Sequence, residues 1–188
     1  MRNTQNGTRR APWRLESLVG APLSIALGVV FVGLCAQIEK DIGPVPLSLQ
    51  TYAVLVVGAI SRPKIAAATL TAYLLVGAFG LPVFANRASG LEHLYGRTAG
   101  YLLGFLVSAV MTSYLVERWS NLAFGRLFWI MMAGHGVILT LGTLWLSTSI
   151  GLQAAIEFGL LPFLVGGVLK SLLAAVTVLG LCEVLSEE

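Results

Sequence analysis

Long apolar segments separated by short polar links constrain the fold of this chain more than any other feature. Residues 160–184, for example, form an almost uninterrupted apolar run, and about 20 such residues in a helix suffice to cross a bilayer. Charged residues make up 11 % of the chain, compared with about 25 % in soluble domains. The apolar runs are continuous instead of alternating, which favours helices over barrel strands. We therefore expect an all-α integral membrane protein.

The pattern predicts six membrane-spanning helices in one membrane domain, residues 18–188. Residues 1–17 are polar and basic, and we expect them to form a disordered cytoplasmic tail. The expected spans are residues 18–37, 49–61, 63–80, 98–116, 127–147 and 160–184.

Six spans place both termini on one side of the membrane. Lys and Arg concentrate in the segments on the same side as the N-terminus, which predicts that both termini are cytoplasmic and the protein lies in the cell (inner) membrane. These basic residues are Arg2, Arg9, Arg10, Arg14, Arg62, Lys64, Arg118 and Arg126, whereas the opposite links carry Lys40, Arg87 and Arg97.

The second expected span is too short to cross a bilayer as a helix. Its 13 residues, 49–61, would cover about 20 Å of a 30 Å core. Residues 43–46 precede it with a glycine and two prolines, which exclude a regular helix there. Backbone of this kind is tolerated inside a membrane only where protein covers it or a wet cavity borders it. Gln50 and Thr51 would then face that cavity, unless they merely cap the helix.

The stretch of residues 81–101 holds dense polar chemistry between two apolar runs. A loop of this length is usually functional or disordered, and its aromatic residues argue against disorder. Arg97 and Thr98 open the fourth span, where a guanidinium and free N–H groups suit an anionic carboxylate. Asn86 and Arg87 are second choices for ligand contacts. The alternative is that Arg97 anchors the helix at the membrane interface.

Lys170 is the single residue that most strongly indicates a binding site. It lies about ten residues inside an apolar span, where a lysine costs a few kcal/mol unless it faces a partner or a wet cavity. Glu157 lies in an outer link and is either solvated or part of the pocket. His135 is expected to be hydrogen-bonded between helices.

Gly20, Ser24 and Gly28 recur every four residues in the first span. A stripe of small residues lets another helix approach closely. The stripe packs either within this protein or against a partner membrane protein.

Several classes of function are disfavoured by what the sequence lacks. There is no P-loop and no GxGxxG motif in a strand–helix context. The two histidines have no acidic neighbours at helical spacing, so we expect no metal and no cofactor. Asp41 is the single aspartate, and no Ser-His-Asp arrangement is visible, so we do not expect an enzyme.

Several segments resemble the BioY family, the biotin-specific S components of energy-coupling-factor (ECF) transporters. The matching segments are residues 44–51 (PVPLSLQT), residues 73–85 (YLLVGAFGLPVFA), residues 96–105 (GRTAGYLLGF), His135, residues 142–146 (GTLWL) and residues 159–164 (GLLPFL) leading to Lys170.

The resemblance implies a six-helix S-component fold that binds biotin from the outside. Arg97, Thr98, Tyr101 and Lys170 fall in the matching segments and are the implied ligand contacts. The small-residue first helix resembles the face that docks on a membrane-embedded coupling subunit, and two cytoplasmic ATPases complete such a transporter. The family usually has Gly-Asp-x-x-Lys where this chain has Gly166-Gly167-Val-Leu-Lys170.

The change at residue 167 leaves three alternatives open. Another acceptor such as Glu157 or Gln153 substitutes for the acid, the affinity for biotin falls, or the ligand is a related small carboxylic acid. A rival function also remains: a solitary carrier that works as a homo-oligomer without an ATPase.

Overall fold

The structure is a computed structural model that describes residues 14–40, 43–119 and 123–186. Within these residues the longer helices are α2 (Ala21–Ala36), α3 (Gln50–Ile60), α4 (Pro63–Ala78), α6 (Ala99–Arg118), α7 (Phe124–Ile150) and α9 (Leu161–Ser186). Each corresponds to one predicted span. Shorter elements connect them: α1 (Leu15–Val19), β1 (Glu39–Lys40), β2 (Leu47–Ser48), η1 (Ala85–Arg87), α5 (Glu92–Tyr95) and α8 (Leu152–Gly159).

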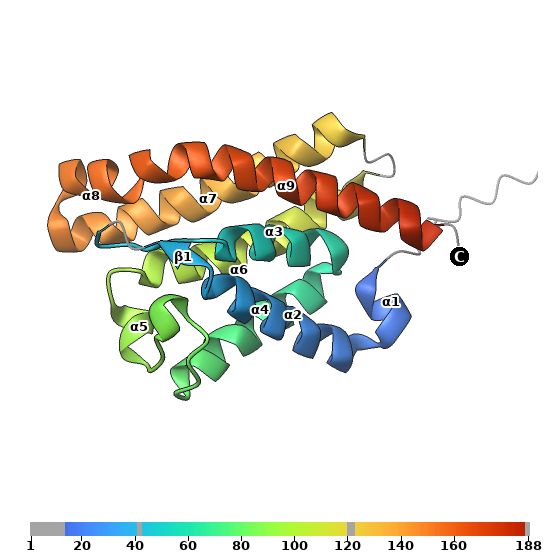
Figure 1. Ribbon diagram of the computed structural model, residues 1–188, viewed down its shortest axis with the longest axis horizontal. Helices are drawn as coiled ribbons and strands as arrows, with labels where there is room; N and C mark the ends of the chain where they lie inside the picture. The colour runs from blue at the N-terminus through green and yellow to red at the C-terminus, as the bar shows by residue number, and fades with distance from the viewer. Residues whose placement is uncertain (1–13, 41–42, 120–122, 187–188) are drawn as a thin grey trace, which may run out of the picture.

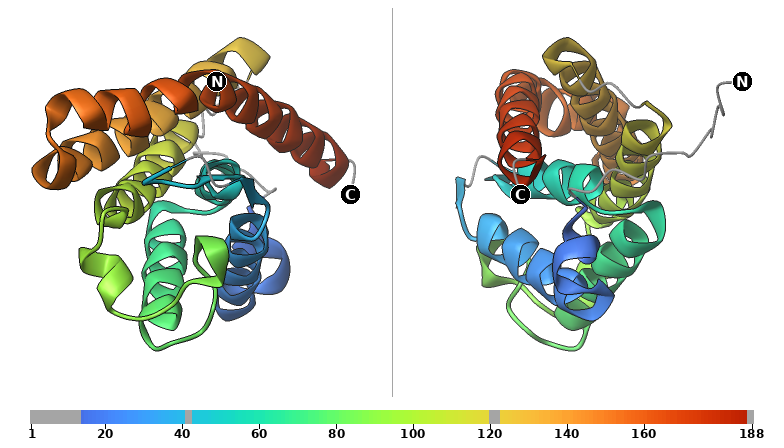
Figure 2. Two further views of the ribbon diagram at one scale, coloured as in Figure 1. Left: turned by 60° about the vertical axis from the view of Figure 1, so that its left-hand side comes forward. Right: turned by 90° about the vertical axis from the view of Figure 1, so that its right-hand side faces the viewer.

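The longer helices run along one common direction (Figure 1). The segments around β1, α5 and α8 lie at one end of the bundle, and α1 lies at the other end with the C-terminal end of α9. Figure 2 shows α7 and α9 on one side of the bundle and α2 and α4 on the other. In the described part, α6, α7 and α9 are long and apolar enough to span a membrane, and α2, α3 and α4 are shorter apolar helices. The chain is a multi-pass membrane protein, and its links gather at two ends as predicted.

Helix α3 forms the centre of the bundle. It contacts α2, α4, α6, α7 and α9, and its residues from Ala53 to Ala59 are all buried. Gly58 allows the closest approach, because a Cβ there would lie 2.7 Å from the backbone oxygen of Ala109 on α6. With 11 residues, α3 covers about 16 Å. It therefore leaves one end of the bundle without a central helix.

Three predictions about the links need correction. The first span breaks at Gly20, whose φ of 82° separates α1 from α2. Residues 81–98 are not structureless, because they contain η1 and α5. Residues 147–157 are helical, since α7 continues to Ile150 and α8 follows. Gly20 thus interrupts a predicted helix, whereas in the other two segments short helices replace the loops that the polar residues suggested.

The predicted disordered tail is partly wrong. Arg14 is buried and donates a hydrogen bond to the carbonyl of Ser61, and Glu16 accepts one from the backbone N–H of Arg62 at 3.0 Å. Helix α1 is thus tied to the turn between α3 and α4. Residues 1–13 lie outside the described residues.

Candidate functional site

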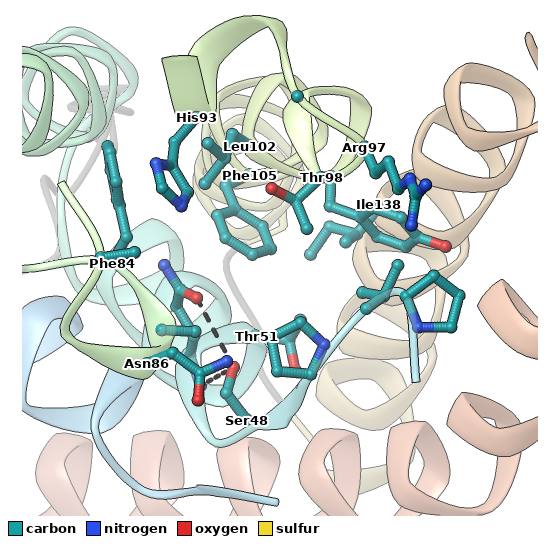
Figure 3. Close-up of a pocket in the computed structure, with 18 of the residues that line it drawn as sticks. Ser48, Thr51, Phe84, Asn86, His93, Arg97, Thr98, Leu102, Phe105 and Ile138 are labelled. Carbon is teal, nitrogen blue, oxygen red and sulfur yellow. Dashed lines mark hydrogen bonds between the residues drawn. The ribbon is translucent and has the colours of Figure 1, made fainter. Parts of the chain in front are cut away.

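A cavity of about 360 Å³ lies in the end of the bundle that α3 does not fill (Figure 3). Its volume is within the range of small-molecule sites, roughly 300–1,000 Å³. The lining residues come from the β1–β2 hairpin, the start of α3, residues 84–98, and α6, α7 and α9. They are Gly43, Pro44, Val45, Pro46, Ser48, Gln50, Thr51, Phe84, Ala85, Asn86, Ala88, Glu92, His93, Gly96, Arg97, Thr98, Tyr101, Leu102, Phe105, Ile138, Leu139, Phe163 and Lys170.

The N-terminal turn of α3 forms one wall of the cavity. Gln50 is buried, and its Nε2 donates to the hydroxyl of Tyr73 on α4 at 2.5 Å. That hydroxyl in turn donates to the carbonyl of Val83 at 2.9 Å. Gln50 therefore lines the cavity and also connects α3 to the covering segment, residues 81–98, which closes the cavity on one side.

Phe84 holds the covering segment against α4. Its ring lies over Gly77, where a Cβ would come within 2.5 Å of the ring, so only glycine fits there. The ring also packs edge-on against Tyr73 and at a tilt against His93, with centroid distances of 5.5 and 5.9 Å. In Figure 3, Phe84 and His93 lie on one side of the cavity and Arg97 lies on the opposite side.

Asn86 and Arg87 follow in left-handed backbone conformations, with φ of 60° and 53°. Asparagine tolerates this region better than most residues. The backbone N–H of Asn86 donates to Oε1 of Glu39 on β1 at 2.7 Å. This bond fixes the tight turn and places Asn86 at the cavity edge.

One face of α6 and the residues just before it form another wall. Thr98, Tyr101, Leu102 and Phe105 have the i, i+3, i+4, i+7 spacing of a single helix face. The hydroxyl of Tyr101 donates to the carbonyl of Gly159 at 2.7 Å, at the joint between α8 and α9. Tyr101 thus contributes its ring to the cavity, while its hydroxyl is occupied in holding the helices together.

Two cationic side chains lie at different depths of the cavity. The Tyr101 and Phe163 rings are 6.2 Å apart, which aligns α6 with α9. Both helices run inward from the same end. Arg97 lies in the turn just before α6, outward from Tyr101. Lys170 lies seven residues inward from Phe163 along α9, about 10 Å. Between them the walls are mostly apolar.

The structure brings together most of the predicted binding residues. Lys170, Arg97, Thr98, Tyr101, Asn86 and Gln50 all line the cavity.

The structure does not place Glu157 among the lining residues. Glu157 is exposed on α8, because that helix packs on α7 at the margin of the bundle.

The predicted stripe of small residues is divided by the break at Gly20. Gly28 packs within this chain, since a Cβ there would lie 2.6 Å from the Thr69 side chain on α4. Ser24 is buried, and its hydroxyl donates to the carbonyl of Ala21 at 2.8 Å. Gly20 is exposed at the start of α2.

Some lining residues were absent from the predicted set. Phe105 is detectable from the helical spacing that begins at Thr98. Phe84, Glu92 and His93 carry no such signal, because Phe84 lies in irregular backbone and the other two lie in a single turn of helix, α5. In the part of the chain that the structure describes, no three His, Cys, Asp or Glu side chains are grouped closely enough to hold a metal ion.

The fold and cavity define a class of membrane protein. A solved structure described as the S component for biotin from an ECF-type ABC transporter matches with a TM-score of 0.77. The match covers 87 % of this chain and 91 % of the solved chain at 24 % identity. The chain therefore has the all-α fold of an S component.

The sequence comparisons give the family. The BioY family model matches residues 8–187, so the chain belongs to the BioY family. A relative from Lactococcus lactis subsp. cremoris, described as biotin transporter BioY2, is 34 % identical over 86 % of this chain and 90 % of its own length. A relative from Thermotoga maritima, described as biotin transporter BioY, is 34 % identical over 89 % of this chain and 96 % of its own.

We predict that Tyr101→Phe destabilises the protein. The change leaves the buried Gly159 carbonyl without its donor, which costs about 1–3 kcal/mol. Thermal unfolding of the detergent-solubilised protein should show a lower Tm. Tyr114→Phe is the matched control, since Tyr114 is 59 % exposed on the same helix. Equal Tm values for the two variants would contradict the role of this hydrogen bond.

Proposed function

We propose that this chain is the biotin-binding subunit of a vitamin uptake system in the cell membrane. The observation that carries the proposal is the pair Arg97 and Lys170, at the outer and inner parts of one largely apolar cavity in a BioY family chain. The relatives named above are described as biotin transporters, which favours biotin as the ligand.

Biotin combines groups that suit this cavity. It carries a carboxylate at the end of an apolar chain and a ureido ring at the other end. The Arg97 guanidinium is the partner for the carboxylate. Lys170 donates to the ureido carbonyl, and the side-chain oxygen of Gln50 accepts from a ureido N–H group. The rings of Phe105 and Phe163 bury the apolar chain.

The mechanism is capture from the outside followed by delivery across the membrane. The covering segment around Phe84 closes the cavity over the ligand. The chain contains no P-loop, so the free energy for delivery comes from a partner, in our proposal an ECF coupling transmembrane subunit with two ATPase subunits. The distribution of Lys and Arg favours both termini in the cytoplasm, where the ATPases act.

One fusion protein tests the orientation and the partners together. We expect a C-terminal GFP fusion to fluoresce, since GFP matures in the cytoplasm, and to co-purify with co-expressed coupling and ATPase subunits. Biotin uptake into cells should then require a functional ATPase. Equal uptake by the chain alone, in cells that lack such subunits, would instead support the solitary carrier.

We expect Lys170→Met to weaken biotin binding by about 10- to 150-fold, the equivalent of a hydrogen bond to a charged group. Isothermal titration of the detergent-solubilised protein measures the Kd. Lys64→Met is the control, because Lys64 is exposed in the first turn of α4 and does not line the cavity. Wild-type affinity in Lys170→Met would remove this lysine from the site, and no binding by the folded wild type would reject biotin as the ligand.

Arg97→Gln should weaken the binding of biotin about tenfold and the binding of neutral biotin amide much less, because the amide has no charge for the guanidinium to pair with. Competition titrations measure both. Arg87→Gln is the matched control, since Arg87 is exposed nearby and does not line the cavity. Equal losses for acid and amide would contradict the carboxylate role.

A further inference from the structure

His135 lies beneath the inner part of the cavity and is not a lining residue. It is 3 % exposed on α7, and neither ring nitrogen has a hydrogen-bond partner among the described residues. A buried polar group without a partner costs about 1–3 kcal/mol. The unpaired imidazole of His135 therefore leaves an acceptor nitrogen available to a donor close by.

The imidazole packs directly on the backbone of α9 at Gly167. A Cβ on Gly167 would lie 2.5 Å from His135 Cδ2 and closer still to Nε2, whereas real Cβ atoms do not approach other atoms within 3.0 Å. Glycine at 167 is thus what admits the ring. The neighbouring Gly166 differs, since a Cβ there would meet only a Leu47 methyl at 3.6 Å.

This contact brings the ring close to Lys170. Gly167 and Lys170 are three residues apart on α9, so their Cβ positions lie about 5–6 Å apart on the same helix face. An ammonium offers three donors and no acceptor, and a neutral imidazole offers one acceptor. A neutral imidazole beside the ammonium avoids the repulsion between two buried like charges.

We propose that His135 is a positioning residue: its Nε2 accepts a hydrogen bond from the Lys170 ammonium and holds that ammonium at the inner end of the cavity, and Gly167 makes the contact possible. The effect on biotin rests on the proposed function, but the contact itself does not. His135 acts through Lys170 and does not touch the ligand.

Nitrogen-15 NMR of histidine tests the contact without any ligand. The chain has two histidines, so comparison with His93→Gln assigns the ring signals of His135. We expect Lys170→Met and Gly167→Ala each to shift the signal of the unprotonated nitrogen by more than its linewidth. Gly166→Ala should leave it in place. An unchanged signal in Lys170→Met would overturn the proposal.

Biotin titrations separate positioning from packing. We expect His135→Phe, which fills the space without an acceptor, to weaken binding about tenfold, and His135→Gln, which retains an acceptor, to recover most of that loss. Tm values identify variants that fail to fold. If a His135 variant does not fold, the NMR shifts in Lys170→Met decide whether the contact exists. Equal losses of biotin affinity in His135→Phe and His135→Gln would mean that the ring acts by packing alone, and would overturn the positioning role. A folded wild type that binds no biotin would reject the proposed function, while the NMR shifts would still decide the His135–Lys170 contact.

Discussion

The short, buried helix α3 is the constraint on which the rest of the structure depends. Five other helices contact it, yet it covers only about 16 Å of a core near 30 Å thick. Extending it outward would fill the cavity with backbone. The prolines at 44 and 46 prevent that extension, so the space above Gln50 is enclosed by irregular segments. In a membrane such backbone must be covered by protein or border a wet site. Here the irregular segments are packed against the bundle and also line the cavity.

Specific contacts hold the covering segment, residues 81–98, against the bundle. The ring of Phe84 over Gly77, the Tyr73 hydroxyl on the Val83 carbonyl and the Glu39 carboxylate on the Asn86 N–H tie it to α4 and β1. The covering segment contains only short helices, and a segment of that kind opens locally at a lower free energy than the long helices beneath it. In the proposed function, this opening lets the ligand enter while the bundle remains intact.

The helices and much of the site were predictable from sequence because bilayer thickness and the cost of buried charge act on residues close together in the chain. Lys170 stands out in an apolar run, and Gln50 follows prolines. Glu157 is exposed on α8 and does not line the cavity, because a polar link can itself fold as a helix. Phe84 and His93 were not placed, since left-handed residues and long-range contacts set their orientation. No local pattern encodes the approach of His135 to Gly167, which joins two helices.

The glycine at 167 therefore has a different meaning in three dimensions from the one that sequence suggests. In sequence it is a missing acid, with Glu157 or Gln153 as possible substitutes. Both of these residues are exposed on α8 and lie outside the cavity lining. The space that a side chain at 167 would occupy is taken by the His135 imidazole from α7. In our proposal this ring supplies an acceptor for Lys170 without the cost of burying a further charge. Glycine at 167 is thus compatible with a working site.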